Sequence, residues 1–108
     1  MRYRIDDSTA VLEVAGELDH HTLRDISLSV THIIETYLPK TLILDMSGVR
    51  FMDSSGLALV IGGSRKMAEV AGRLIVRNVP PQPMKVFTAA GISRYVTLEN
   101  SRESSVNV

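Results

Sequence analysis

The segment most able to do chemistry is Asp53-Ser54-Ser55-Gly56, which follows a predicted buried strand and stands where a helix is expected to begin. A helix N-terminus presents unpaired backbone N–H groups and the positive end of the helix dipole, so it stabilises an anion. Serine is also preferred there because its side-chain oxygen accepts a hydrogen bond from an N–H two or three residues later. The segment therefore indicates either a plain capped helix or a site for an anionic group.

Three functions would use a serine in this place. A nucleophilic serine of a hydrolase stands in a Gly-x-Ser-x-Gly turn, but here Met52 or Asp53 occupies the position of the first glycine. A loop that binds the phosphate of a nucleotide or flavin carries a glycine-rich motif that this chain lacks, and the Asp53 carboxylate would repel the phosphate. Phosphorylation of the serine itself, on a surface that binds a protein, requires no catalytic neighbours. We therefore expect a binding protein with no catalytic residues and no cofactor.

Composition narrows the classes of partner. Twelve Lys and Arg residues balance twelve Asp and Glu residues, whereas a sequence-independent nucleic-acid binder or a polybasic membrane-surface module needs a basic excess. The chain has no cysteine, which excludes disulfides and thiolate metal sites. Its histidines, His20, His21 and His32, have no carboxylate cluster at metal-site spacing. We therefore expect a protein partner, with no direct nucleic acid, no membrane and no metal.

Neither a targeting segment nor a membrane span is predicted. The longest strongly apolar stretch, residues 56–63, is far shorter than the roughly 20 residues that cross a bilayer. Ile5-Asp6-Asp7 follows the basic start, where a signal peptide needs an apolar run. We expect a soluble cytoplasmic protein. A length of 108 residues predicts one domain over residues 1–108, with a loose polar tail from about residue 100.

The apolar periodicity predicts strands alternating with helices. We expect strands over residues 3–5, 11–15, 41–45, 74–76 and 95–98, and helices over residues 23–37, 57–71 and 84–90. Gly16 is expected to end the second strand, Ser47-Gly48 to form a turn, and Thr22 to Asp25 to form a capping box. Such alternation implies parallel pairing through right-handed crossovers, here with an antiparallel hairpin at the N-terminal edge. The predicted fold class is a single α/β domain whose mixed, mostly parallel sheet is packed against helices.

Two segments form a specific pair, Gly16-Glu17-Leu18-Asp19-His20-His21-Thr22 and Phe51-Met52-Asp53-Ser54-Ser55-Gly56-Leu57. Together they resemble the anti-sigma factor antagonists of the STAS domain family. The likeness is nearest to the sporulation-type antagonists, which act on the forespore sigma factor. It covers nearly the whole chain with a matching order of elements, and it implies the STAS fold.

The resemblance implies a switch that composition does not reveal. Such antagonists bind an anti-sigma factor that is also a serine kinase, and they thereby free the sigma factor. The resemblance places the phosphorylated residue at Ser54; the phosphate breaks the complex and a serine phosphatase restores it. The residues implied to contact the partner are Asp19, His20, His21, Thr22, Asp53, Ser55 and Gly56.

Four interpretations stay open from the sequence. Within the family, the chain is either a sporulation-type antagonist, a general-stress-response antagonist, or a STAS subunit of a larger signalling complex. From another class, a phosphate- or nucleotide-binding α/β domain would use the same helix start.

Overall fold

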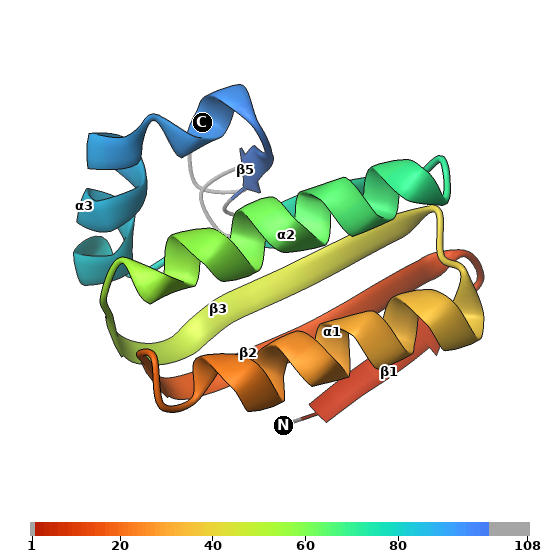
Figure 1. The fold of residues 1–108 in the computed structure, drawn as a ribbon, viewed down its shortest axis with the longest axis horizontal. Coiled ribbons are helices and arrows are strands. Elements are labelled where there is room, and N and C mark those ends of the chain that lie inside the picture. The colour runs from red at the N-terminus through yellow and green to blue at the C-terminus, as the bar shows by residue number, and fades with distance from the viewer. Residues whose placement is uncertain (1, 100–108) are drawn as a thin grey trace, which may run out of the picture.

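A computed structural model describes residues 2–99 of the chain, and these residues form a five-stranded sheet with the strand order β1-β2-β3-β4-β5 (Figure 1). The strands are β1 (Arg2–Asp6), β2 (Thr9–Leu18), β3 (Thr41–Met52), β4 (Arg73–Arg77) and β5 (Thr97–Glu99). The helices are α1 (Leu23–Tyr37), α2 (Ser55–Glu69) and α3 (Pro81–Ala90), with a 3-10 turn at Ile92–Arg94. β1 is antiparallel to β2 and the other neighbours are parallel, so the predicted fold class is confirmed. The predicted tail from residue 100 lies outside the described residues.

Helices α1 and α2 lie side by side across one face of the sheet (Figure 1). Each helix turns the apolar stripe seen in its sequence toward the strands. The buried side chains of these two stripes are Ile26, Val30, Ile33 and Ile34 on α1, and Leu59, Val60 and Met67 on α2. They form one core with inward-facing residues of the sheet such as Leu12, Leu44 and Val76. This core holds the starts of both helices close to the carboxyl ends of the strands that precede them.

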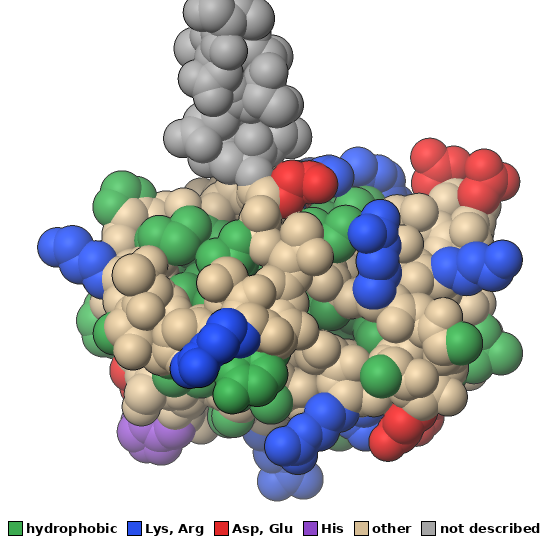
Figure 2. Space-filling model, turned by 90° about the horizontal axis from the view of Figure 1, so that it is seen from above, with side chains coloured by type: hydrophobic (Ala, Val, Ile, Leu, Met, Phe, Trp, Pro, Cys, Tyr) green, Lys and Arg blue, Asp and Glu red, His purple; other side chains and the backbone are tan. Residues whose placement is uncertain are grey.

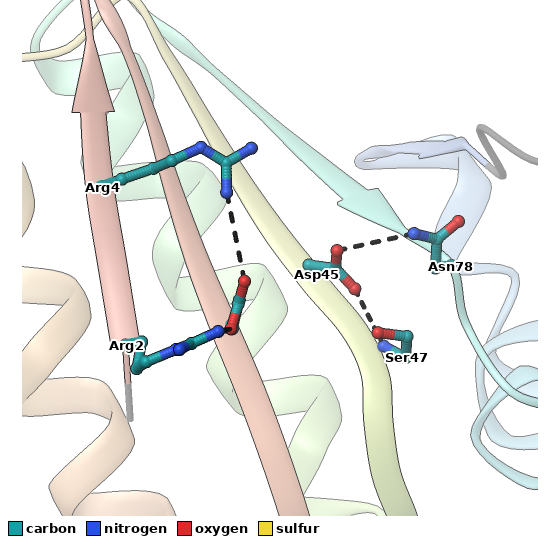
Figure 3. A network of polar contacts seen from close by, with 6 residues as sticks. Arg2, Arg4, Asp45, Ser47 and Asn78 are labelled. Carbon is teal, nitrogen blue, oxygen red and sulfur yellow. Dashed lines mark hydrogen bonds and ion pairs between the residues drawn. The ribbon is translucent and has the colours of Figure 1, made fainter.

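On the opposite face of the sheet, side chains of the strands form the surface (Figure 3). Val11, Ile43 and Ile75 stand in register across it and are buried as a second, small cluster. Beside them, Arg2 donates to Glu13 Oε1 at 3.1 and 3.3 Å, and Arg4 lies 4.0 Å from Glu13 Oε2. Exposed ion pairs of this kind contribute about 0–1 kcal/mol. The sequence predicts a buried third strand, but among residues 2–99 helices cover β3 on one face only.

Strands β2 and β3 run further than the sequence predicts. β2 continues through Gly16 to Leu18, and β3 continues through Ser47-Gly48 to Met52. Two register shifts in their pairing, typical of β-bulges, allow this, and Gly16 adopts a positive φ of 85° between them. The predicted strand end and turn are thus wrong, because bulges absorb the turn-like residues within a continuing ladder. The extra length carries both recognised segments to the same end of the sheet.

Charged side chains of both signs are interspersed on the face shown in Figure 2, without a large patch of one sign. This distribution agrees with the equal numbers of basic and acidic residues in the sequence. Among the helices of residues 2–99, none combines the length and apolar character needed to cross a membrane.

Candidate functional site

Two loops leave neighbouring strands at the same edge of the sheet (Figure 1). The histidine loop, residues 19–22, follows β2, and the serine loop, residues 53–55, connects β3 to the first residue of α2. Leu18 and Met52 are paired at the strand ends, and the Asp53 N–H donates to the Leu18 carbonyl at 3.2 Å. The fold therefore brings together the two recognised segments, although 28 residues lie between them in the sequence.

The serine loop is shaped by Asp53 rather than by either serine. Asp53 Oδ1 accepts a hydrogen bond from the Ser55 N–H at 2.8 Å, the local pattern of an Asx-turn. Ser54 is the N-cap residue of α2, but its backbone is already near helical (φ −65°, ψ −13°) and its side chain makes no capping hydrogen bond. The expectation that a serine oxygen caps this helix is therefore wrong. The Ser54 side chain is exposed, and its hydroxyl has no structural task at the helix start.

The histidine loop has its own Asx-type anchor. Asp19 Oδ1 accepts hydrogen bonds from the backbone N–H groups of His21 (3.0 Å) and Thr22 (3.1 Å). Thr22 Oγ1 donates back to the Glu17 carbonyl at 2.8 Å and makes no cap to α1, so the predicted capping box is not formed. His20 and His21 are both exposed, with ring centroids 4.0 Å apart. The loop thus presents two imidazoles from a backbone held by one carboxylate.

The Asp19 carboxylate is kept ionised by these contacts. Desolvation raises the pKa of Asp19, but the hydrogen bonds from the Thr22 and His21 backbones, the nearby His21 side chain and the Thr22 hydroxyl together outweigh it. The pKa of Asp19 therefore lies below its ordinary value of 3.8. At neutral pH the Asp19 side chain carries a full negative charge.

Gly56 is buried, so in this structure its contribution is to packing. A Cβ built on Gly56 would lie 2.6 Å from Met52 Cγ, closer than real Cβ atoms come to other heavy atoms. Met52 itself is completely buried. A glycine is needed here because the first turn of α2 rests directly on the last residue of β3. Asp53 and Ser55 beside it are partly exposed and remain predicted contact residues, as do the residues of the histidine loop.

Three residues at this edge were missed in the sequence. Phe51 keeps 45% of its surface exposed, because the bulge before it breaks the alternation that would turn it inward with Val49. Arg50, the residue skipped by that register shift, lines an open cavity of about 480 Å³ together with Glu17 and other residues around the histidine loop. The bulge offers no local sequence signal beyond Gly16, so these exposures were not predictable.

The third missed residue is Gln82, near the start of α3. Its side-chain amide forms two hydrogen bonds with the backbone of Met52: Oε1 accepts from the N–H at 2.8 Å, and Nε2 donates to the carbonyl at 2.9 Å. In the sequence, Gln82 is a polar residue between Pro81 and Pro83, and this pattern identifies no hydrogen-bond partner.

Among residues 2–99, no group of three or more His, Asp or Glu side chains is arranged to hold a metal ion.

Comparisons with known proteins agree with this architecture. The family model described as STAS domain matches residues 1–105. The anti-sigma F factor antagonist of Lysinibacillus sphaericus is 35% identical over 99 residues, which cover 92% of this chain and 84% of the relative. The solved structure of the anti-sigma factor antagonist SpoIIAA in its unphosphorylated form is similar with a TM-score of 0.79 and 33% identity, covering 95% of this chain and 90% of that one.

A second solved structure, of the Bacillus cell fate determinant SpoIIAA in its phosphorylated form, is similar with a TM-score of 0.71 and 32% identity. That match covers 98% of this chain and 96% of the other. The resemblance inferred from the two sequence segments is thereby confirmed.

Proposed function

This chain belongs to the STAS domain family, and from that membership we propose that it is an anti-sigma factor antagonist switched by phosphorylation of Ser54. In its unphosphorylated form it binds an anti-sigma factor that is also a serine kinase, so that the sigma factor is released. The kinase transfers the γ-phosphoryl group of ATP to Ser54 Oγ, the hydroxyl proton is lost, and ADP leaves. A serine phosphatase hydrolyses the phosphate ester and restores binding. The relatives named for sigma F and for cell fate favour sporulation, in the cytoplasm, as the setting.

The observation that carries this proposal is the free hydroxyl of Ser54. Ser54 is exposed at the helix start and its side chain makes no capping hydrogen bond. The N–H groups of Gly56 and Leu57, which a Ser54 cap would bind, donate instead to the backbone carbonyls of Asp53 and Ser54. A kinase can therefore modify this oxygen without breaking a hydrogen bond that the fold needs. The same argument favours Ser54 over Ser55, which is partly buried and donates its backbone N–H to Asp53.

Phosphorylation is expected to act on the complex and to leave the fold of the free antagonist intact. A phosphoserine carries a charge of about −1.5 to −2 at neutral pH. At the N-terminus of α2 the helix dipole stabilises it by about 0.3–1 kcal/mol, which is too little to rearrange a packed core. In an interface, however, an unpaired dianion must lose its water at a cost of several kcal/mol. Because each 1.4 kcal/mol is tenfold in affinity, exclusion of the phosphate is sufficient for a switch.

The negative charge of the site indicates the charge of the partner surface that binds it. Asp19 and Asp53 both contribute carboxylates at this edge, and neither carboxylate has a basic side chain within salt-bridge distance among the described residues. A surface of this kind is complementary to a basic patch on the anti-sigma factor. The phosphate adds to the negative charge already present, so a partner that accepts the two carboxylates around a neutral serine still has to accommodate an additional dianion.

The test uses the purified anti-sigma factor of the same organism in two assays. The first measures phosphorylation of this chain in the presence of Mg-ATP, and the second measures the affinity of this chain for the anti-sigma factor. Ser54→Ala should bind the anti-sigma factor and take up no phosphate, whereas Ser54→Asp should bind at least about 100-fold more weakly. Ser55→Ala is the matched control, since it alters the neighbouring hydroxyl and should still be phosphorylated on Ser54. Mass mapping of the modified residue and titration calorimetry measure both effects. Phosphate found only on Ser55, or equal affinity of the modified and unmodified chains, would refute the proposal.

A further inference from the structure

The side chain of Gln82 completes the hydrogen bonding of Met52 from across the molecule. Oε1 accepts from the Met52 N–H at 2.8 Å and Nε2 donates to the Met52 carbonyl at 2.9 Å, over a sequence separation of 30 residues. A primary amide offers the same donor and acceptor as a peptide unit. Gln82 therefore takes the place of a strand residue next to the last residue of β3.

This place is open because β4 is much shorter than β3. The pairing of β3 with β4 ends at Asp45 and Arg77, while β3 continues to Met52. On its other side, the end of β3 is joined to β2 through the Asp53 N–H and the Leu18 carbonyl. Met52 thus directs its own N–H and carbonyl toward α3, where no strand follows. Since Met52 is completely buried, these two groups would lack partners without Gln82.

The start of α3 is built to hold this amide still. Pro81 is the first residue of the helix and Pro83 is buried, and each proline ring fixes its own φ. One turn later, Phe87 is completely buried and anchors the helix in the main core. Gln82 therefore projects from a backbone with little freedom, so its two hydrogen bonds lose little entropy when they form.

We propose that Gln82 is a positioning residue: by clamping Met52, it holds the serine loop in the geometry that the anti-sigma kinase binds and phosphorylates. The inference rests on the proposed function of Ser54. Met52 is covalently joined to Asp53, whose carboxylate shapes the loop, and its side chain supports Gly56 in the first turn of α2. A shift of Met52 is therefore passed to both ends of the loop that presents Ser54. Gln82 thereby links α3 to the serine loop, although α3 contributes no residue to that loop.

The first experiment measures the clamp without any partner. In Gln82→Leu, which keeps a similar volume but no donor or acceptor, amide hydrogen exchange at Met52 should accelerate about tenfold or more. Exchange at Leu44, in the middle of β3, should stay unchanged, because β2 and β4 flank that part of the strand. Lys85→Ala, an exposed change on the same helix, is the matched control and should alter neither amide. Unchanged protection at Met52 in Gln82→Leu would overturn the inference.

The second experiment measures the consequence for the partner. With the same anti-sigma kinase and Mg-ATP, kcat/KM for Gln82→Leu should fall about tenfold, while Lys85→Ala matches the wild-type chain. If wild-type and Gln82→Leu chains are phosphorylated equally although Met52 has lost protection, the inference fails and the proposed function stands. If the wild-type chain itself is not phosphorylated, the proposed function is wrong, and the inference that rests on it is wrong as well.

A conservative variant keeps the proposal testable if Gln82→Leu does not fold. In Gln82→Glu the carboxylate can accept from the Met52 N–H, but it faces the Met52 carbonyl without a proton to donate. Protonation restores that donor, so amide chemical shifts at Met52 and Asp53 should titrate with an elevated glutamic acid pKa. Protection at Met52 should return on the acid side of this titration. The wild-type chain should show no such transition, and its absence in Gln82→Glu would also overturn the inference.

Discussion

Gly56→Ala is expected to destabilise the fold at the point where α2 rests on the end of β3. The new Cβ would lie 2.6 Å from Met52 Cγ, so one of the two must move. Met52 has little room to do so, because its side chain is completely buried and Gln82 holds its backbone at 2.8 and 2.9 Å. Overpacking of this kind costs about 1–3 kcal/mol.

Gly62→Ala, on the same helix, is the matched control. A Cβ at Gly62 would meet nothing within 4 Å, so alanine there should stabilise the helix by up to about 1 kcal/mol. Both variants replace a glycine of α2 by alanine and only the one at Gly56 meets Met52, so their difference reports mainly the clash. A difference of 1–3 kcal/mol corresponds to at least about 4 °C in Tm for a domain near this size.

Thermal and urea unfolding of both variants measure this difference. In a Met52→Ala background, Gly56→Ala should cost nothing further, because the clashing atoms are gone; the two changes are coupled. Equal melting temperatures for Gly56→Ala and Gly62→Ala in the otherwise unchanged chain would refute the packing argument. The role of Gly56 would then have to be sought in an interface.

Two other predictions concern the surface of the site. Because the pKa of folded Asp19 lies below 3.8, its ionised form contributes stability above that pH, and the contribution disappears as pH falls through the folded-state value. In urea unfolding, the free energies of unfolding of wild type and Asp19→Asn should therefore differ most at neutral pH and not at all in strong acid. A difference that stays constant with pH would contradict this. Phe51→Ala should weaken binding of the anti-sigma factor by about 1–3 kcal/mol in calorimetry, with little loss of stability, since 45% of the surface of this residue is exposed. Tyr95→Ala, similarly exposed but placed after α3, should bind normally, and equal losses in both variants would argue against a Phe51 anchor.

The order of elements was accessible from the sequence alone, and so was the choice of the two segments that the fold brings together. Apolar residues at helical spacing located α1 and α2, and alternation with turn residues located the N-terminal hairpin. Parallel strands end at the same edge of a sheet, so the two recognised segments were also bound to meet if the strands were neighbours. The element predictions rest on periodicities of a few residues, which survive without knowledge of distant contacts, whereas the two segments were singled out by the family resemblance.

The tertiary structure decided the details that depend on pairing between distant segments. Bulges between β2 and β3 lengthened both strands and exposed Phe51, and no local pattern reports a register shift. The N–H groups of Gly56 and Leu57, which a capping Ser54 would bind, donate to backbone carbonyls instead and leave the Ser54 hydroxyl without a capping bond. Gln82 acquired its role only because β4 ends early and leaves Met52 without a strand neighbour. Sequence determines which groups are present, but a hydrogen bond needs both partners in place, and only the packed chain brings residues thirty positions apart to within 3 Å.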